Sequence, residues 1–154
     1  MGYGESNMNI EIRQFNGPHD WGWVQQQVPL LRVQDTCGIV AVDSYTDTTV
    51  GAIIFDNFLY NSAQATIMAT TPMLFRHPFL FEAMNFIFEG CDKDYIYCFI
   101  ADSNRASMRL CKHLGFKPQM TIKEGYGKDD NFVVMELAKK DCIDYWAQFD
   151  KEVA

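Results

Sequence analysis

Residues 99–116 read Phe-Ile-Ala-Asp-Ser-Asn-Arg-Ala-Ser-Met-Arg-Leu-Cys-Lys-His-Leu-Gly-Phe, and this stretch decides the fold class. A continuous apolar strand is predicted over Tyr95–Ala101, of the kind that is buried on both faces of a sheet. It runs into several polar residues that suit a helix N-cap, Asn104 among them, and Gly115 is expected to stop the helix that follows. Residues Lys117–Glu124 then alternate as a strand. The stretch therefore predicts a strand–helix–strand crossover.

The rest of the chain predicts antiparallel hairpins before this crossover and one after it. The expected order is β-α-β-β-β-α-β-α-β-β-α, which indicates an α+β or mixed α/β sheet protein. Residues 1–7 are expected to be a flexible lead-in and residues 8–154 a single domain, without repeats or linkers. Further strands are predicted at Met8–Ile12, Cys37–Tyr45, Thr49–Phe58, Ala63–Ala69 and Asn131–Ala138. Helices are predicted at Trp21–Leu31, at Phe79–Glu89, from the N-cap candidates at 102–104 through Leu114, and at 141–153. Gly90 is expected to end the second of these in a left-handed conformation.

Composition excludes several classes of protein. Apolar residues make up 48% of the 154 residues and the net charge is −7, which argues against disorder and against nucleic-acid binding. The longest apolar runs, such as Val50–Phe55, are too short to span a membrane. No basic N-terminus precedes an apolar run, so a cytoplasmic protein is expected. The 5 cysteines form no C-x-x-C pair and the 3 histidines lack ligand spacing, so neither disulfides nor a metal site are expected.

The segment from Asn104 to Phe116 resembles the N-x-x-A/S-x-x-L-x-x-x-L-G-F signature of the GNAT superfamily of acyl-CoA-dependent N-acyltransferases. The matching residues are Asn104, Ser107, Leu110, Leu114, Gly115 and Phe116. The resemblance extends over roughly residues 8–138 and is nearest to the variant common in tailed-phage genomes. It implies a GNAT fold, with a central mixed, mostly antiparallel sheet flanked by helices, and acetyl-CoA as the co-substrate.

Local charge is consistent with such a coenzyme. Residues 104–118 contain Arg105, Arg109, Lys112 and Lys117 and no acid, in a chain of net charge −7. Coenzyme A carries a pyrophosphate and a 3′-phosphate, which bind where backbone N–H groups and positive charge are gathered. A solvated basic helix face is the alternative interpretation.

The resemblance also implies which residues contact the coenzyme. Its usual pyrophosphate loop is rich in glycine, whereas residues 76–81 contain none and Pro78 removes one N–H donor. Weaker or altered coenzyme binding is therefore expected. The implied contacts are Ala69, Thr70, Thr71, Arg76, His77, Phe79, Leu80, Asn104, Arg105, Ser107 and Arg109.

In the superfamily the amine attacks the thioester directly, without an acyl-enzyme. The candidate catalytic residues are Asn104, Ser107 and Cys111, the last in the place where many members carry a tyrosine that protonates the leaving thiolate. A packed Cys111 is the alternative. No residue stands out as the base that deprotonates the amine. Glu124 and Asp56 are weak candidates, and solvated turn acids are the alternative for both.

The acceptor is expected to be a small-molecule or protein amine, bound by Trp21–Leu31 and the hairpin at Asp129, which are variable regions in the family. A homodimer is also compatible with the resemblance. A second hypothesis is a catalytically degenerate GNAT-fold protein that serves in phage assembly or binds a host protein through the aromatic segment Tyr145–Phe149. The location would then be the virion instead of the host cytoplasm, and no nucleic acid or membrane partner is expected in either case.

Overall fold

The computed structural model describes residues 8–28, 34–76 and 78–142. They form one seven-stranded sheet in the order β1-β2-β3-β4-β5-β7-β6. Every neighbouring pair of strands is antiparallel except β4 and β5, which are parallel. The strands are β1 (Ile10–Gln14), β2 (Cys37–Asp43), β3 (Thr48–Asp56), β4 (Ser62–Ala69), β5 (Tyr95–Ala101), β6 (Lys117–Gly127) and β7 (Asp130–Ala138). The mixed, mostly antiparallel sheet is thus confirmed.

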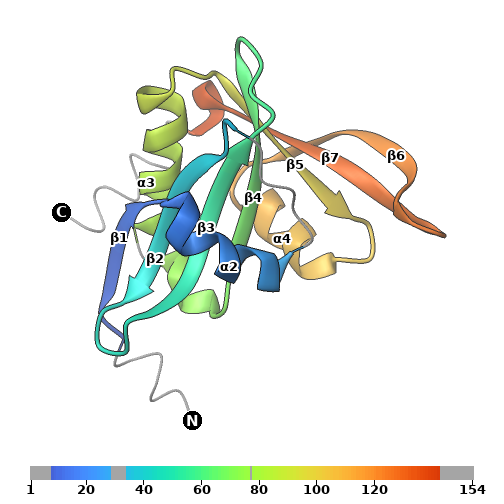
Figure 1. Cartoon of the computed structure of the whole chain (residues 1–154). Helices are drawn as coiled ribbons and strands as arrows, with labels where there is room; N and C mark the ends of the chain where they lie inside the picture. The colour runs from blue at the N-terminus through green and yellow to red at the C-terminus, as the bar shows by residue number, and fades with distance from the viewer. Residues whose placement is uncertain (1–7, 29–33, 77, 143–154) are drawn as a thin grey trace.

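Helices cover both faces of this sheet (Figure 1). Helix α2 (Gly17–Gln27) buries Val24 against Val40, Ala52, Ile54 and Met68 on one face. Helices α3 (Phe79–Asn85) and α4 (Arg105–His113) pack into the larger apolar cluster on the other face. The alternation of side chains along β2 and β3 supplies both clusters, because successive residues of a strand point to opposite faces.

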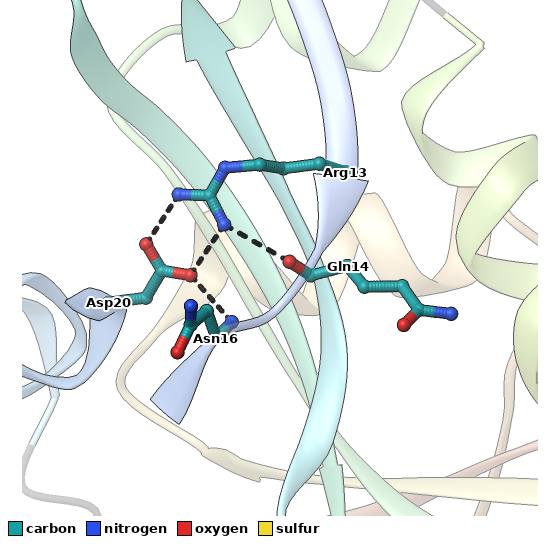
Figure 2. Close-up of polar contacts among 4 residues, drawn as sticks. All are labelled: Arg13, Gln14, Asn16 and Asp20. Carbon is teal, nitrogen blue, oxygen red and sulfur yellow. Dashed lines mark hydrogen bonds and ion pairs between the residues drawn. The ribbon is translucent and has the colours of Figure 1, made fainter. Parts of the chain in front are cut away.

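An ion pair fixes α2 to the edge strand β1. Arg13 on β1 donates two hydrogen bonds to the Asp20 carboxylate, at 2.8 Å and 2.6 Å, as Figure 2 shows. The backbone N–H of Asn16 donates a third at 2.7 Å. Asp20 lies in the first turn of α2 and is only 3% exposed. A buried carboxylate needs such partners, and they hold the angle at which the chain enters the helix.

The predicted crossover is confirmed from β5 through α4 to β6. Asn104 is the N-cap of α4, and its side chain accepts a hydrogen bond from the N–H of Ser107. Gly115 follows the helix with φ +100°, a conformation that favours glycine. Met108, Cys111 and Leu114 lie on the buried face of the helix. This local pattern is sufficient to place α4 directly after β5.

Several predicted boundaries were wrong. The helix after β4 is preceded by a 3-10 turn at Pro72–Arg76, and it changes into one π-helical turn at Phe86–Gly90. A left-handed residue after this helix is found at Asp92, with φ 55°, and not at Gly90. Strand β6 runs on to Gly127, so the predicted loop at 125–130 is a two-residue turn within a long hairpin that projects from the sheet (Figure 1).

The helix predicted over Trp21–Leu31 begins earlier, at Gly17, because Pro18 occupies the first turn, where proline is tolerated. Its predicted end and the proline at 29 lie outside the described residues, as do the lead-in at 1–7 and residues 143–153 of the predicted final helix. Residues 139–142 are helical.

Candidate functional site

A gap opens in the middle of the sheet between the two parallel strands. β4 and β5 are paired only where Ser62–Gln64 faces Tyr95–Tyr97. Beyond this point β4 continues to Ala69 and β5 to Ala101, but no further pairing joins them. A cavity of about 430 Å³ occupies the gap. Its walls include the stretches of both strands that follow their last paired residues.

The cavity is lined from both faces of the sheet. Gln27 and Val28 at the end of α2 contribute from one face, while α4 contributes Ser107 and Cys111 from the other. Because α2 and α4 cover opposite faces, the cavity extends through the sheet at the gap. The predicted acceptor regions, the end of α2 and the β6–β7 hairpin, are brought to the same cavity as the predicted coenzyme helix.

Three of the predicted site residues line this cavity: Asn104, Ser107 and Cys111. Asn104 Oδ1 accepts the Ser107 N–H at 3.2 Å, so the amide of this side chain also caps the helix. The cap holds the α4 N-terminus beside the gap, with its backbone N–H groups directed outward from the helix end. Polar groups at this end of the cavity are therefore positioned by the helix itself.

Cys111 packs against a second thiol, on the neighbouring strand. Cys98 and Cys111 are 4% and 3% exposed, and both line the cavity. The hydrogen bond between them, together with burial, raises the pKa of Cys98 well above its ordinary value. Cys98 therefore stays a neutral thiol at neutral pH and leaves no negative charge on this wall.

The remaining predicted coenzyme residues lie outside the cavity lining. Ala69 is the last residue of β4, and Thr70 and Thr71 follow it. The Thr70 hydroxyl donates a hydrogen bond to the Val50 carbonyl. The side chains of Phe79 and Leu80 are buried in the core, so only their backbone groups, at the start of α3, are available for a coenzyme. Exposed residues of α4, Arg105 and Arg109, point into solvent, and Arg105 pairs with Asp102 at 3.6 Å. The Arg76 side chain and His77 lie outside the described residues.

Neither candidate base lines the cavity. Asp56, at the end of β3, is 4% exposed and its Oδ1 has no hydrogen-bond partner, so the expectation of a solvated turn acid was wrong. Burial and the nearby Asp35 carboxylate raise the pKa of Asp56. Glu124 is exposed on β6 in a left-handed conformation, φ 51°, and its N–H bonds to Asn131. Among the described residues that line the cavity there is no carboxylate.

Three aromatic side chains of the cavity wall were not predicted. Phe99 on β5 meets Phe132 on β7 edge to face, with ring centroids 5.9 Å apart, and Phe132 meets Tyr126 on β6 at 5.8 Å. These three residues, termed the aromatic wall, all line the cavity. Phe99 could not be singled out within a strand of buried character. Its neighbours Phe132 and Tyr126 reach it only through the pairing of β5 with β7 and β7 with β6.

Ser103 is a further lining residue that was not predicted, and it is held by a carboxylate. Asp130 at the start of β7 accepts hydrogen bonds from the Ser103 hydroxyl at 2.5 Å and from its backbone N–H at 3.2 Å. Asp130 itself is not part of the lining. These bonds join the loop before α4 to the β6–β7 hairpin.

Several solved structures have the same fold at low sequence identity. A mutant form of the spermidine/spermine N-acetyltransferase SpeG from Vibrio cholerae superposes with a TM-score of 0.73 at 14% identity, over 89% of this chain and 99% of that one. The same enzyme in complex with CoA and spermine gives 0.69 at 14% identity, over 87% and 98%. Its dodecameric structure in an intermediate state gives 0.68 at 13%, over 85% and 94%. The chain has the GNAT fold.

The sequence matches no protein-family model and no curated protein. Within the described part of the chain, no helix is long and apolar enough to cross a membrane, and no group of three or more His, Cys, Asp or Glu side chains is placed to hold a metal ion. The interrupted β4–β5 pairing, with a helix after each strand, is the part of this fold at which the cavity lies.

Proposed function

We propose that the chain is an acetyl-CoA-dependent N-acyltransferase that moves an acetyl group directly to an amine in a ternary complex. The observation that carries this is the gap between β4 and β5, which opens a cavity lined by the capped N-terminus of α4. A cavity through the sheet lets an acyl donor enter from one face and an acceptor from the other. The likeness to SpeG, of which one structure is a complex with CoA and spermine, supports this assignment.

In this proposal the coenzyme lies along the unpaired edge of β4. From Ala65 to Ala69, β4 is paired with β3 on one side, and no described strand pairs with its other edge. Backbone N–H and C=O groups on such an edge suit the amides of the pantetheine arm. The phosphates are then directed toward the start of α3 and the basic residues of α4, Arg105 and Arg109.

The reaction needs little covalent chemistry from the protein. The lone pair of the amine attacks the thioester carbonyl carbon and the C–S bond breaks. The nitrogen loses one proton and the departing thiolate gains one, so that the products are an amide and free coenzyme A. Cys111 and Ser107 lie in the cavity wall, where an S–H or O–H could supply that proton. Asn104 caps the helix through Oδ1 and, in this proposal, offers its side-chain N–H groups to the coenzyme.

Calorimetric titration with acetyl-CoA tests the proposal. The wild-type protein is expected to bind with a Kd in the micromolar range. Asn104→Ala and Asn104→Ser form the matched pair, because serine caps a helix about as well as asparagine and alanine does not. If the amide contacts the coenzyme, both variants bind at least about tenfold more weakly. If Asn104 only caps the helix, Asn104→Ser retains full affinity.

Absence of binding at millimolar acetyl-CoA would overturn the proposed activity. The degenerate, non-catalytic GNAT-fold protein would then be the better hypothesis. The next experiment would be a search for phage or host protein partners of the segment at 145–149.

A further inference from the structure

The wall of the cavity that would receive the acceptor combines aromatic rings with an absence of charge. Phe99, Phe132 and Tyr126 form a continuous edge-to-face series, and Phe99 and Tyr126 are 39% and 60% exposed. Rings left open to solvent in this way can bury a further ring in offset or edge-to-face contact. They belong to β5 and the β6–β7 hairpin, and together with Val28 at the end of α2 they line the cavity.

No described lining residue carries a formal charge. The polar groups of the lining are amides, hydroxyls and thiols. Two carboxylates lie close to lining residues without lining the cavity themselves. Asp130 accepts the Ser103 O–H and N–H on its two oxygens, and Glu136 on β7 is hydrogen-bonded to Tyr97, next to Cys98 on β5. A multiply charged amine would lose its hydration in this cavity without gaining a counter-charge.

The lack of a carboxylate among the described lining residues also affects how an amine could be activated. An alkylamine is protonated at neutral pH, and a base must remove that proton before the nitrogen can attack. In an arylamine the lone pair is delocalised into the ring, so the nitrogen is already uncharged at neutral pH. Such an amine needs no carboxylate for activation and brings a ring that fits the aromatic wall.

Building on the proposed acyltransferase activity, we propose that the acceptor is a neutral aromatic amine, bound with its ring against Phe99, Phe132 and Tyr126. The nitrogen forms a bond to the acetyl carbonyl carbon, and the C–S bond of the thioester breaks. One N–H proton is transferred to the thiolate, directly or through the Cys111 thiol. The products are an N-aryl acetamide and free coenzyme A, so atoms and charge balance without a further reactant.

A panel of three amines at pH 7 tests the substrate class, with acetylated product measured by mass spectrometry. The panel is p-toluidine, phenethylamine and spermidine: a neutral aromatic amine, a cationic amine with a similar ring, and a polyamine. We expect kcat/KM for p-toluidine to exceed that for phenethylamine at least tenfold, and no turnover of spermidine. Turnover of spermidine or phenethylamine at a rate equal to or above that of p-toluidine would overturn the proposal.

The proposed function and the acceptor class fail in different ways. Absence of acetyl-CoA binding in the calorimeter removes the acyltransferase activity and this inference with it. Acetyl-CoA binding without acetylation of p-toluidine leaves the coenzyme site standing and overturns the acceptor class alone. Asp130→Asn adds a further test, because a loss of activity that is confined to the cationic amines would identify Asp130 as their base.

Two glycines of the hairpin provide a matched pair for the aromatic wall. A methyl group on Gly125 would come within 2.7 Å of Cδ2 of Phe132, whereas one on Gly127 would meet nothing within 4 Å. Gly125→Ala therefore displaces the Phe132 ring. We expect it to raise KM for p-toluidine about tenfold with acetyl-CoA affinity unchanged, as Phe132→Leu should also do. Gly127→Ala should change neither. Unchanged KM in both Gly125→Ala and Phe132→Leu would exclude the wall as the acceptor site.

Discussion

Gln64 and Tyr97 are the last residues at which β4 and β5 are paired, and the sheet divides immediately beyond them. The division costs backbone hydrogen bonds in the centre of a sheet, where they are normally complete. Antiparallel pairing continues on the outer side of both strands, with β3 and with β7, so each half of the sheet remains stable. The gap is thus a built-in feature of the fold, and it leaves main-chain groups free for a ligand.

Gly38 is expected to be among the positions least tolerant of a side chain. Its φ is +149°, and a Cβ there would lie 2.1 Å from the carbonyl oxygen of Ile53 on the paired strand. Because that atom belongs to the backbone, β2 and β3 must shift to admit even a methyl group. Gly38→Ala should lower the free energy of unfolding by at least about 2 kcal/mol, measured by urea denaturation.

Gly22→Ala is the matched control for this substitution. Gly22 lies within α2, and a Cβ there would meet nothing within 4 Å. Alanine favours the helix over glycine, so this variant should be more stable than wild type by about 0.5–1 kcal/mol. Equal destabilisation by both substitutions would contradict the assigned contact at Gly38.

The Arg13–Asp20 pair should make the free energy of unfolding depend on pH in the acidic range. Burial of Asp20 alone would raise its pKa, but the hydrogen bonds from Arg13 and from the Asn16 N–H outweigh burial and lower the pKa below 3.8. A lowered folded-state pKa stabilises the protein fully above about pH 4, and this contribution is lost as the pH falls through the folded value. Asp20→Ala should cost about 2 kcal/mol at pH 7 and less at pH 3.

Arg13→Lys tests the geometry of that pair. Lysine keeps the charge but cannot form the two parallel hydrogen bonds that Figure 2 shows, so an intermediate loss is expected. For Asp20→Ala, an equal loss of unfolding free energy at pH 7 and pH 3 would contradict the expected pH dependence. The carboxylate charge would then contribute nothing, and the loss would come from packing.

Asp56 should show the opposite dependence on pH. Burial, with the Asp35 charge, raises its pKa, so the folded state binds this proton more tightly than the unfolded state does. The ionised side chain then destabilises the fold above its raised pKa, and the penalty disappears as the pH falls toward the ordinary value of 3.8. Asp56→Asn should stabilise the protein by about 1 kcal/mol at pH 7, with no gain at pH 3.

Activity measurements on Asp56→Asn decide whether this residue is the base. Because Asp56 is not part of the cavity lining, kcat should be retained. Asp35→Asn is the matched control, since it removes the neighbouring charge and leaves the buried carboxylate in place. A fall in kcat of a hundredfold or more in Asp56→Asn, but not in Asp35→Asn, would assign the base to Asp56.

The local patterns predicted the elements, whereas the composition of the cavity depends on contacts distant in sequence. Asn104 and Gly115 stand at the two ends of one short helix, so the sequence alone identifies both the N-cap and the residue that ends the helix. Phe132 reaches Phe99 only through the register that pairs it with Ala101. Asp56 ends an apolar strand as a turn acid does, yet it is buried and interacts electrostatically with Asp35 and Cys37, about 20 residues earlier in the chain. No local pattern reveals that approach.

The proposed catalytic role of Cys111 can be tested directly by substitution. If its thiol protonates the departing coenzyme A sulfur, Cys111→Ala should lower kcat about a hundredfold while acetyl-CoA affinity is retained, because the proton is needed only as the C–S bond breaks. Cys98→Ala is the matched control, since it removes the hydrogen-bonded thiol from the facing strand. A comparable loss of kcat in the two variants would assign the effect to packing of the cavity wall. A loss confined to Cys111→Ala, partly restored by Cys111→Tyr, would identify the side chain at this position as the acid.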